Sequence, residues 1–248
     1  MADHKELLNL IDPHKMPKHI GIIMDGNGRW AKKHHRPRLF GHRAGAKASR
    51  QAVELAVEIK LPVLTMYAFS TENWSRPASE VTGLMKLLKE LLIKEIPDLD
   101  RQNVFLRFIG SPENVDQALW QEIQAMTAVT HGNTGLNLNI AFNYGGRQEI
   151  IEGIKKLFKT SESNPEFISK LSPDVLGRYL YTAGHPDPDL IIRTSGEFRL
   201  SNFLLWQSAY SELYISPVLW PDFDKSEFCK AILDYQSRNR RFGGIEAT

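Results

Sequence analysis

One carboxylate, Asp25, follows a short apolar run and precedes two glycines and an arginine. The apolar run covers residues 19–24, and Asp25 is followed directly by Gly26, Asn27, Gly28, Arg29 and Trp30. Isoleucine favours a buried strand, which would fix the direction of the Asp25 side chain. Glycine has no Cβ, so backbone N–H groups can come close to an anion. The stretch therefore predicts a strand that delivers a carboxylate to a phosphate-binding turn.

Positive charge gathers after this turn. No acidic residue lies between Asp25 and Glu54, while the same stretch supplies Arg29, Lys32, Lys33, Arg36, Arg38 and Arg43. Such a local field favours a multiply charged anion. Two ordinary interpretations stay open from these residues alone, because Asp-Gly and Asn-Gly are common turn dipeptides and a basic run often forms a solvated face.

Residues 26–31 also match the dinucleotide-binding pattern G-x-G-x-x-A. That pattern should open an apolar helix and be followed by an acid about 20 residues further on. Here the chain continues with the basic, histidine-containing residues 32–38, and the next convincing strand begins only at Pro62. We therefore exclude a dinucleotide-binding fold.

A second group of residues suited to anions lies late in the chain. Arg193 and Arg199 can bind phosphate oxygens bidentately, and Ser195, Gly196 and Ser201 add hydroxyl and backbone donors between and beside them. This group resembles a diphosphate cradle. Glu212 follows, and with Asp25 it would give two oxygen ligands for Mg²⁺. Glu212 could equally form a structural salt bridge with one of these arginines, and spacing alone leaves both interpretations open.

Length and composition indicate one α/β domain. The chain has 248 residues, of which 42% are hydrophobic, and a net charge of +2. The positive charge is local, so the expected partner is a small anion and not a nucleic acid. The one cysteine, Cys229, excludes an internal disulfide and a thiolate metal cluster, and it is expected to pack as a small apolar residue.

The chain termini and the targeting signals give further expectations. Residues 1–18 lack the uninterrupted apolar segment of a signal peptide, and no apolar run approaches about 18 residues. We expect a cytoplasmic protein without a spanning helix. Its single domain covers residues 1–248, with residues 1–17 as an N-terminal extension and residues 238–248 as a flexible, basic C-terminal tail.

Strands and helices are expected to alternate along the chain. Apolar patterns predict strands near residues 19–24, 62–69, 104–109, 136–142, 190–192 and 212–215. Helices are predicted near residues 45–60, 80–96, 112–129, 148–158, 173–181 and 225–237, and a helix or strand near 203–207. This order implies a mainly parallel sheet with helices on both sides.

Open parallel sheets bind ligands beyond the carboxyl ends of their strands. Four polar clusters follow predicted strands at those ends, and they comprise Asp25 with Asn27, residues 70–76, residues 143–147 and residues 193–201. Each cluster separately could be loop chemistry, and residues 70–73 could simply cap a helix. Their convergence on one edge of the sheet predicts an anion-binding site.

Five motifs in order resemble the cis-prenyltransferases, with the closest likeness to the bacterial undecaprenyl diphosphate synthases. The motifs cover residues 25–30, 41–45, 69–76, 143–147 and 189–197, and the resemblance runs from Pro17 to Gly244. The chain also lacks the D-D-x-x-D motif with which trans-type prenyl synthases hold metal. Phe198 departs from the family, where a polar residue is common at this position.

The resemblance implies a reaction and its components. Such enzymes extend farnesyl diphosphate with isopentenyl diphosphate units, adding cis double bonds and releasing diphosphate, to give undecaprenyl diphosphate, the lipid carrier precursor of bacterial cell-wall synthesis. It implies Mg²⁺, a homodimer in which the C-terminal tail reaches the neighbouring subunit, and delivery of product to the membrane, where the enzyme would be cytoplasmic or peripheral at the inner face.

The same resemblance implies a role for each matching residue. Asp25 would hold Mg²⁺ and assist departure of the allylic diphosphate, Asn73 would act in proton removal, and Glu212 would contribute to the metal. An amide is a poor base, so we expect Asn73 to position a water molecule or the departing diphosphate. The substrate-binding set comprises Gly26, Asn27, Gly28, Arg29, Trp30, Arg38, His42, Ser70, Thr71, Glu72, Trp74, Arg76, Arg193, Arg199, Leu200 and Ser201, of which residues 70–76 would form a loop that closes over the substrates.

The family also encloses its growing product in a hydrophobic tunnel. The resemblance places that tunnel between the sheet and the helices that contain residues 45–60 and 83–96, with Leu136 and Phe142 setting its depth. An ordinary core would explain the same apolar residues. Two other functions stay open. A non-catalytic partner subunit is disfavoured because Asp25, Asn73, Arg193, Arg199 and Glu212 are all present. The second is a Mg²⁺-dependent phosphohydrolase with Asp25 as nucleophile.

Overall fold

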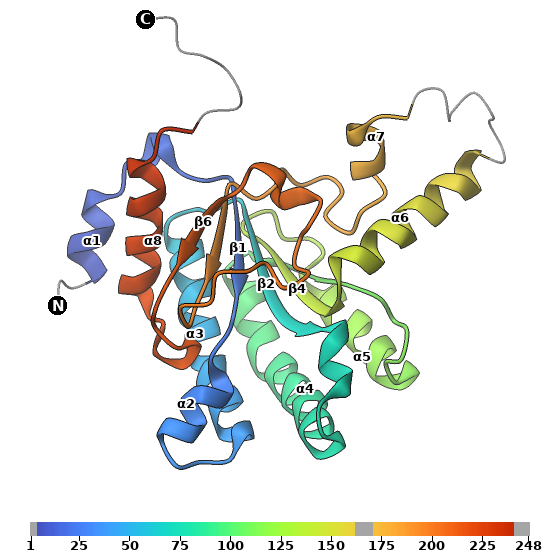
Figure 1. Ribbon diagram of the computed structural model, residues 1–248, viewed down its shortest axis with the longest axis horizontal. Coiled ribbons are helices and arrows are strands. Elements are labelled where there is room, and N and C mark those ends of the chain that lie inside the picture. Colours follow the sequence, from blue (N-terminus) through green and yellow to red (C-terminus); the bar gives the residue numbers. More distant parts are fainter. Residues whose placement is uncertain (1–3, 162–170, 241–248) are drawn as a thin grey trace, which may run out of the picture.

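The fold is built on one parallel sheet (Figure 1). The computed structural model describes residues 4–161 and 171–240. Within them, six strands lie in the order β3-β4-β2-β1-β5-β6, and every neighbouring pair is parallel. The strands are β1 (His19–Ile23), β2 (Val63–Ser70), β3 (Phe105–Ile109), β4 (Asn137–Tyr144), β5 (Leu190–Arg193) and β6 (Glu212–Ile215). The expected α/β fold with a mainly parallel sheet is confirmed.

The helices follow the strands in the order that parallel pairing requires. They are α1 (His4–Leu10), α2 (Asn27–Lys33), α3 (Arg38–Glu58), α4 (Ala78–Arg101), α5 (Gln117–Thr127), α6 (Gly146–Ser161), α7 (Pro173–Gly177) and α8 (Lys225–Ser237). Short 3-10 turns join them at η1 (Pro13–Lys15), η2 (Thr71–Ser75), η3 (Ala128–Thr130), η5 (Gln207–Tyr210) and η6 (Trp220–Asp222).

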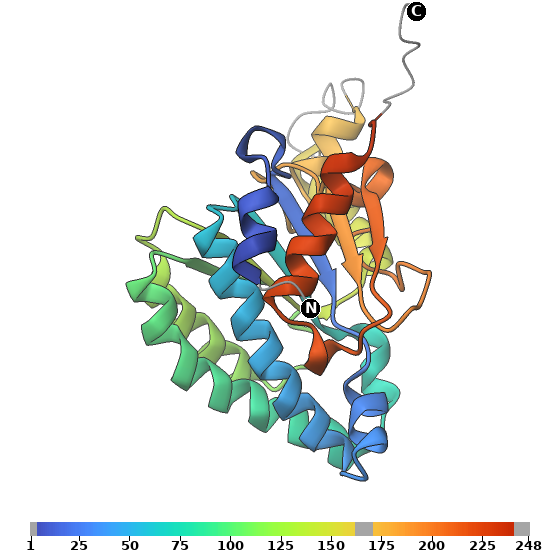
Figure 2. The same ribbon diagram turned by 90° about the vertical axis from the view of Figure 1, so that its left-hand side faces the viewer.

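The two faces of the sheet are covered differently. The larger core packs α3, α4, α5 and α8 against one face, and Figure 2 shows α3, α4 and α8 lying over it. The smaller core, on the other face, joins Tyr67 and Tyr144 to Phe203 and Leu204 of the segment that follows β5. All five residues of β1 are buried, as expected for a strand covered on both faces.

Helix α3 begins at Arg38, seven residues before the predicted start. Pro37 immediately precedes it, and proline at the start of a helix loses no helical hydrogen bond. A second helix, α2, was not predicted and begins directly after Gly26, whose φ of +114° lies in the left-handed region. The glycine that was interpreted as part of a turn therefore also starts a helix.

Segment 203–207 is neither the helix nor the strand that its apolar residues suggested. Ser201, Asn202 and Leu204 all have positive φ, at 49°, 64° and 45°, which bends the chain back on itself. Phe203 and Leu204 are fully buried by this bend. Tertiary burial therefore overrides the local preference of these residues.

The first and last helices, α1 and α8, pack together on one side of the sheet. Helix α1 packs on α8, and Cys229 of α8 is buried, as predicted for a packing residue. Arg238 pairs with Glu212 and Asp234, so the described start of the predicted C-terminal tail contacts the domain. Residues 241–248, the rest of that tail, lie outside the described residues. None of the helices in the described part of the chain has the length and apolar character to span a membrane.

Candidate active site

The four predicted polar clusters meet at one edge of the sheet. They follow β4, β2, β1 and β5, which are consecutive neighbours in the strand order. Because all these strands are parallel, their carboxyl ends share one edge. The predicted convergence is confirmed, and we call this edge, with the residues that follow these four strands, the polar rim.

The backbone of Asp25 is fixed from two distant parts of the chain. Its carbonyl oxygen accepts hydrogen bonds from Thr194 Oγ1 at 2.6 Å, Ser195 Oγ at 2.8 Å and the Trp220 N–H at 3.0 Å. A Cβ on Gly26 would lie 2.3 Å from Ser195 Oγ, so only glycine fits there. The turn after β1 is thus held in place by the segment after β5.

The Asp25 carboxylate lies between two guanidinium groups. Oδ2 is 3.0 Å from Arg193 Nη2 and 3.1 Å from Arg29 Nη2. The Arg193 side chain is only 5% exposed, and its other amino group donates to Ser201 Oγ at 2.6 Å and to the Arg199 carbonyl. Arg193 is therefore a rigid positive group, whereas Asp25, at 28% exposed, remains accessible.

Glu197 lies between two arginines of the polar rim, Arg29 and Arg199. Its carboxylate is 2.7 Å from Arg29 Nη1 and 2.6 Å from Arg199 Nη1. The hydrogen bonds from Arg199 and Arg29 hold the pKa of Glu197 below its usual value. The sequence alone predicts no separate role for Glu197, which is only one residue of the motif 189–197. Its position between two arginines, four residues after Arg193, was the signal available for a role.

A pocket of about 300 Å³ lies beside Asp25. It is lined by Met24, Asp25, Gly26, Asn27, Gly28, Arg29, Lys32, Arg38, His42 and Arg76. A Cβ on Gly28 would lie 3.2 Å from the Arg38 guanidinium, so the glycine lets this group come close to the turn. The structure thus brings together most of the predicted residues of the first motif with Arg38, His42 and Arg76.

Two polar atoms beside this pocket are poorly satisfied: His42 Nε2 has only a 3.5 Å contact with Glu80, and Asn27 Oδ1, which lies against Gly45 of α3, accepts no hydrogen bond from the described residues. Nδ1 of the same imidazole lies 3.3 Å from Asn27 Nδ2. Burial lowers the pKa of His42, so the neutral imidazole is favoured. Buried unpaired polar atoms are costly, and in a polar pocket they indicate a place for a polar ligand.

The carboxylate of Glu80, a residue that was not predicted for the site, contacts three basic side chains at the wall of this pocket. Its carboxylate lies 3.1 Å from Arg38 Nε, 3.2 Å from Arg76 Nη1 and 3.5 Å from His42 Nε2. Glu80 follows Arg76 by four residues at the start of α4, and this spacing was the available sequence signal.

The segment after β2 forms the 3-10 turn η2. Asn73 Oδ1 accepts the Ser70 N–H at 3.2 Å, Glu72 Oε1 accepts from Asn202 Nδ2 at 2.9 Å, and Trp74 Nε1 donates to Asn143 Oδ1 at 2.7 Å. These bonds join the clusters after β2, β4 and β5. The Asn73 amide oxygen caps its own turn.

Trp30 lies at the outer side of α2. Its Nε1 donates to Asp222 at 2.7 Å, and its ring stacks on His34 with centroids 3.9 Å apart. Leu200 packs against the smaller core. Neither Trp30 nor Leu200 lines the polar pocket, and a contact of either with substrate stays a prediction.

Glu212 does not come near Asp25 within one chain. The register pairs Leu190 with both Ile20 and Glu212, so Glu212 is level with the start of β1, whereas Asp25 follows its end. Five residues of strand span roughly 16 Å. Glu212 pairs instead with Arg238, at 2.8 Å. Among the residues that the structure describes, no three carboxylate, histidine or cysteine side chains gather as a metal site.

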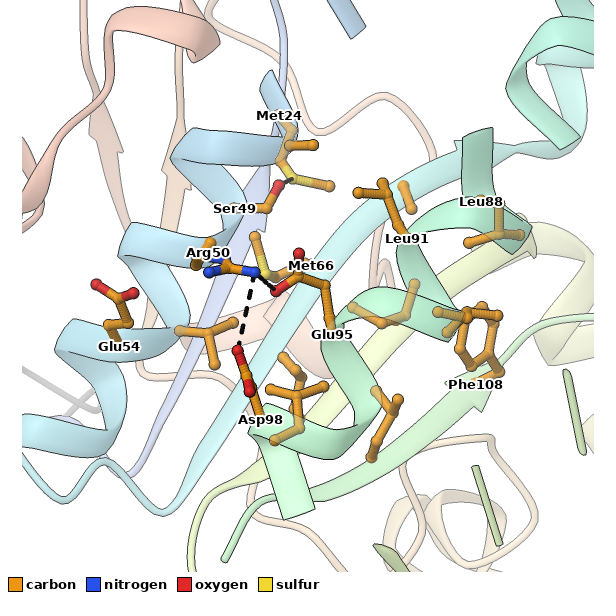
Figure 3. A pocket seen from close by; sticks show the side chains of 18 of the residues that line it. Met24, Ser49, Arg50, Glu54, Met66, Leu88, Leu91, Glu95, Asp98 and Phe108 are labelled. Carbon is orange, nitrogen blue, oxygen red and sulfur yellow. Dashed lines mark hydrogen bonds and ion pairs between the residues drawn. The ribbon is translucent and has the colours of Figure 1, made fainter. Parts of the chain in front are cut away.

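An apolar cavity of about 180 Å³ lies between the sheet, α3 and α4 (Figure 3). Met24 lines both this cavity and the polar pocket, so the two adjoin. The strands contribute Met66, Ala68, Leu106, Phe108, Leu138 and Ile140 to its lining. Leu136 and Phe142, which were expected to set the depth of a tunnel, are buried in the core and do not line it.

Known proteins resemble this chain over nearly its whole length. The family model described as undecaprenyl diphosphate synthase matches residues 23–243. An isoprenyl transferase of Heliobacterium mobile is 50% identical over 245 residues, covering 99% of this chain and 94% of the relative. A ditrans,polycis-undecaprenyl-diphosphate synthase of Haemophilus ducreyi, named as specific for (2E,6E)-farnesyl diphosphate, is 49% identical, covering 95% and 97%.

Solved structures have the same fold. Lavandulyl diphosphate synthase of Lavandula x intermedia, in complex with dimethylallyl diphosphate, has a TM-score of 0.89 and 31% identity, covering 93% of this chain and 100% of that one. A probable undecaprenyl diphosphate synthase of Campylobacter jejuni has a TM-score of 0.75 and 32% identity, covering 92% and 99%. The chain therefore belongs to the undecaprenyl diphosphate synthase family of prenyltransferases.

Proposed function

We propose that this protein extends farnesyl diphosphate by successive condensations with isopentenyl diphosphate, forming undecaprenyl diphosphate. One observation carries the proposal: Asp25 is held between Arg29 and Arg193 at the polar rim, directly beside an apolar cavity. The rim suits two diphosphate groups, and the cavity suits a hydrocarbon chain. The relative from Haemophilus ducreyi, named for farnesyl diphosphate, supports the choice of starter.

The polar pocket is the proposed seat of the allylic diphosphate. Arg29 and Arg38 supply positive charge there, and the turn of Gly26, Asn27 and Gly28 supplies close backbone. His42 contributes an imidazole whose Nε2 has only a long contact, 3.5 Å, with Glu80. Diphosphate oxygens would satisfy the imidazole donor and compete with Asp25 and Glu80 for the guanidinium groups.

Arg193, Arg199 and Ser201 are the proposed seat of isopentenyl diphosphate. Arg193 is already oriented by Ser201 and Asp25, so it loses little side-chain freedom on binding. Arg199 is 58% exposed and pairs with the carboxylate of Glu197. A diphosphate can displace that carboxylate because an exposed ion pair is weak.

The donor set near Asp25 fits Mg²⁺. Magnesium takes one or two carboxylates together with substrate phosphates, and Asp25 is a partly exposed carboxylate in a pocket built for phosphates. When bound, Mg²⁺ would neutralise the charge that develops on the departing diphosphate.

Each condensation breaks the allylic carbon–oxygen bond, forms a carbon–carbon bond and releases a proton and diphosphate. Arg29 and Arg38, which line the pocket proposed for the allylic diphosphate, would stabilise the negative charge that grows on this leaving group. The Asn73 oxygen is used by the Ser70 N–H, which supports a role in shaping the loop over one as proton acceptor. Closure of residues 70–76 over the substrates would exclude water from the reacting carbons.

The remaining parts of the proposal concern the product. The cavity beyond Met24 would take the growing chain and is the start of the proposed hydrophobic tunnel. A role of Glu212 at the metal requires a second copy of the chain, because Glu212 lies far from its own Asp25. We therefore propose a homodimer, from which the product passes to the membrane.

The test is elongation by the purified chain with farnesyl diphosphate, radiolabelled isopentenyl diphosphate and Mg²⁺, followed by sizing of the products. We expect a polyprenyl ladder from the wild type and none from Asp25→Ala, whose folding is checked by circular dichroism. No elongation by folded wild-type protein would overturn the proposal and favour a partner-subunit role. A phosphate covalently trapped on Asp25 would instead establish a hydrolase.

A further inference from the structure

Charged side chains join α3 to α4 along the edge of the apolar cavity. Arg50 of α3 lies 2.5 Å from Glu95 and 3.9 Å from Asp98, both of α4. All three residues line the cavity, and Figure 3 shows them pointing toward one another across the gap between the two helices. The opposite wall, on the strands, is apolar. The helices α3 and α4 also contribute apolar side chains, such as Val53 and Leu92, so the ion-pair cluster is a charged part of an otherwise mainly apolar lining.

This cluster is exposed enough to open. The side chains of Arg50, Glu95 and Asp98 are 38%, 25% and 36% exposed. Ion pairs that remain in contact with water are weak, because solvent takes over the charges when the pair separates. Separation would leave no buried charge without a partner.

The helix that carries both acids has a weak point between them. Pro97 lies inside α4, between Glu95 and Asp98. Proline cannot donate the backbone hydrogen bond of its position, and its ring crowds the preceding turn, so a helix bends most easily there. The Arg50 cluster therefore ties α4 to α3 at the site where α4 is most easily deformed.

We propose that Arg50, Glu95 and Asp98 form an ion-pair latch that closes a lateral exit from the cavity, and that its opening, with bending of α4 at Pro97, releases the long-chain product. The inference rests on the proposed function, because the occupant is the apolar chain of a polyprenyl diphosphate. A long hydrocarbon cannot leave through the polar rim without passing the charged groups that hold its diphosphate. The contact between α3 and α4 at this cluster is the proposed alternative path, because the cavity lies directly behind it.

Release and elongation compete once the chain is long. A weaker latch should therefore speed release and shorten the average product. Glu95→Gln and Arg50→Met remove the charge attraction, and we expect each to raise the release rate about fivefold, the effect of losing one moderately exposed pair.

Glu90→Gln is the matched control. Glu90 also lies on α4 and pairs with an arginine of α3, at 3.7 Å from Arg43 Nη2, but it does not line the cavity. The same chemical change is thus made in the same pair of helices away from the cavity. We expect its release rate and product length to match the wild type.

The enzyme is loaded by incubating it in excess over farnesyl diphosphate with radiolabelled isopentenyl diphosphate, so that each enzyme molecule makes at most one product. Transfer of this product to phosphatidylcholine vesicles is followed over time, and the products are sized in parallel. Faster transfer and shorter products for Glu95→Gln and Arg50→Met, but not for Glu90→Gln, support the latch. Wild-type transfer rates in both latch variants, or longer products without faster transfer, would overturn it. Absence of polyprenyl product from the wild type would instead refute the proposed function, so the two failures are distinguishable.

A charge exchange guards against effects of misfolding. Asp98 would repel an acid at position 50, so the exchange Arg50→Glu/Glu95→Arg is made in an Asp98→Asn background, where it restores opposite charges across the same gap. We expect the exchange to slow product release again, to near the wild-type rate. The thermal midpoint should stay close to that of the single variants. Release as fast as in the single variants would overturn the assignment to the ion pair.

Discussion

The polar rim and the apolar cavity adjoin at Met24 but are stabilised in opposite ways. At the rim, single side chains are fixed by hydrogen bonds between residues far apart in sequence, as Thr194 and Ser195 fix the carbonyl of Asp25. The cavity is bounded mainly by apolar side chains, which contact one another without directional bonds. One region therefore specifies atom positions, and the other specifies only a volume.

This difference suits the two ends of the proposed substrate. A diphosphate is the same group in every condensation cycle, so a rigid seat can serve all of them. The hydrocarbon chain lengthens in each cycle, so its container must tolerate many lengths. Substitutions at the rim should therefore change rates, while substitutions around the cavity should change product length or stability.

The largest expected effect lies behind the cavity. Phe142 is 2% exposed and packs against Phe69 and Phe108, with ring centroids 5.6 and 6.1 Å away. Phe142→Ala should lower the free energy of unfolding by about 3–5 kcal/mol, because it leaves a void in the core. Urea denaturation measures this, and product sizing should show no lengthening.

Phe108→Ala is the partner of that experiment, because Phe108 is only partly buried and lines the cavity itself. We expect a smaller loss of stability and a change in product length. Longer products from Phe142→Ala, with wild-type products from Phe108→Ala, would contradict the assignment of Phe142 to the core and of Phe108 to the cavity.

At the rim, Arg193→Met should reduce kcat/KM for isopentenyl diphosphate about 10²–10³-fold, a loss comparable to that of one preorganised donor in an oxyanion hole. Arg193 also holds Asp25 and Ser201, so Asp25 would lose its orientation. Steady-state kinetics at saturating farnesyl diphosphate provides the measurement. A loss below tenfold would contradict a rigid, directional rim.

Acid should weaken the fold at a site away from both regions. His19 is buried at the start of β1, where its ring nitrogens contact Pro186 O and Thr65 Oγ1, each at 2.7 Å. Burial lowers its pKa from 6.5 to about 4, so the unfolded chain takes up a proton first as the pH falls. Stability is therefore fully present above pH 6.5 and is lost progressively down to about pH 4.

Between pH 7 and pH 5 this histidine should cost about 2 kcal/mol of unfolding free energy. Urea titrations at both pH values test it. His19→Asn should be less stable at pH 7 but should show a flatter dependence on pH. An equally steep dependence in the variant would assign the effect to other groups, such as His185, whose pKa burial also lowers to about 4.

The smallest effect is expected at the exposed side of the rim. Arg199→Met should raise KM for isopentenyl diphosphate about tenfold, since a half-exposed charge-assisted contact is worth less than a buried one. The thermal midpoint should not change, because Arg199 is 58% exposed. An effect as large as that of Arg193→Met would remove the distinction between oriented and mobile arginines.

The sequence alone determined the alternation of strands and helices, the parallel sheet and the grouping of polar residues at strand ends. These features depend on local periodicity and on chain order, which are visible in one dimension. Five motifs in order also sufficed for the family resemblance, because each motif combines residue types that rarely occur together by chance.

Only the tertiary structure decided which of those residues meet. Spacing hints at the Arg76–Glu80 and Glu197–Arg199 pairs, but only the fold brings Glu80 to Arg38, Glu197 to Arg29 and Asn202 to Glu72. Glu212 is separated from Asp25 because the strand register places them at opposite ends of the strands. Likewise, the Phe142 side chain lies in the core, whereas the Phe108 side chain lines the cavity. Local patterns determine which face of a strand is apolar, but packing between distant elements determines whether that face is filled or left open.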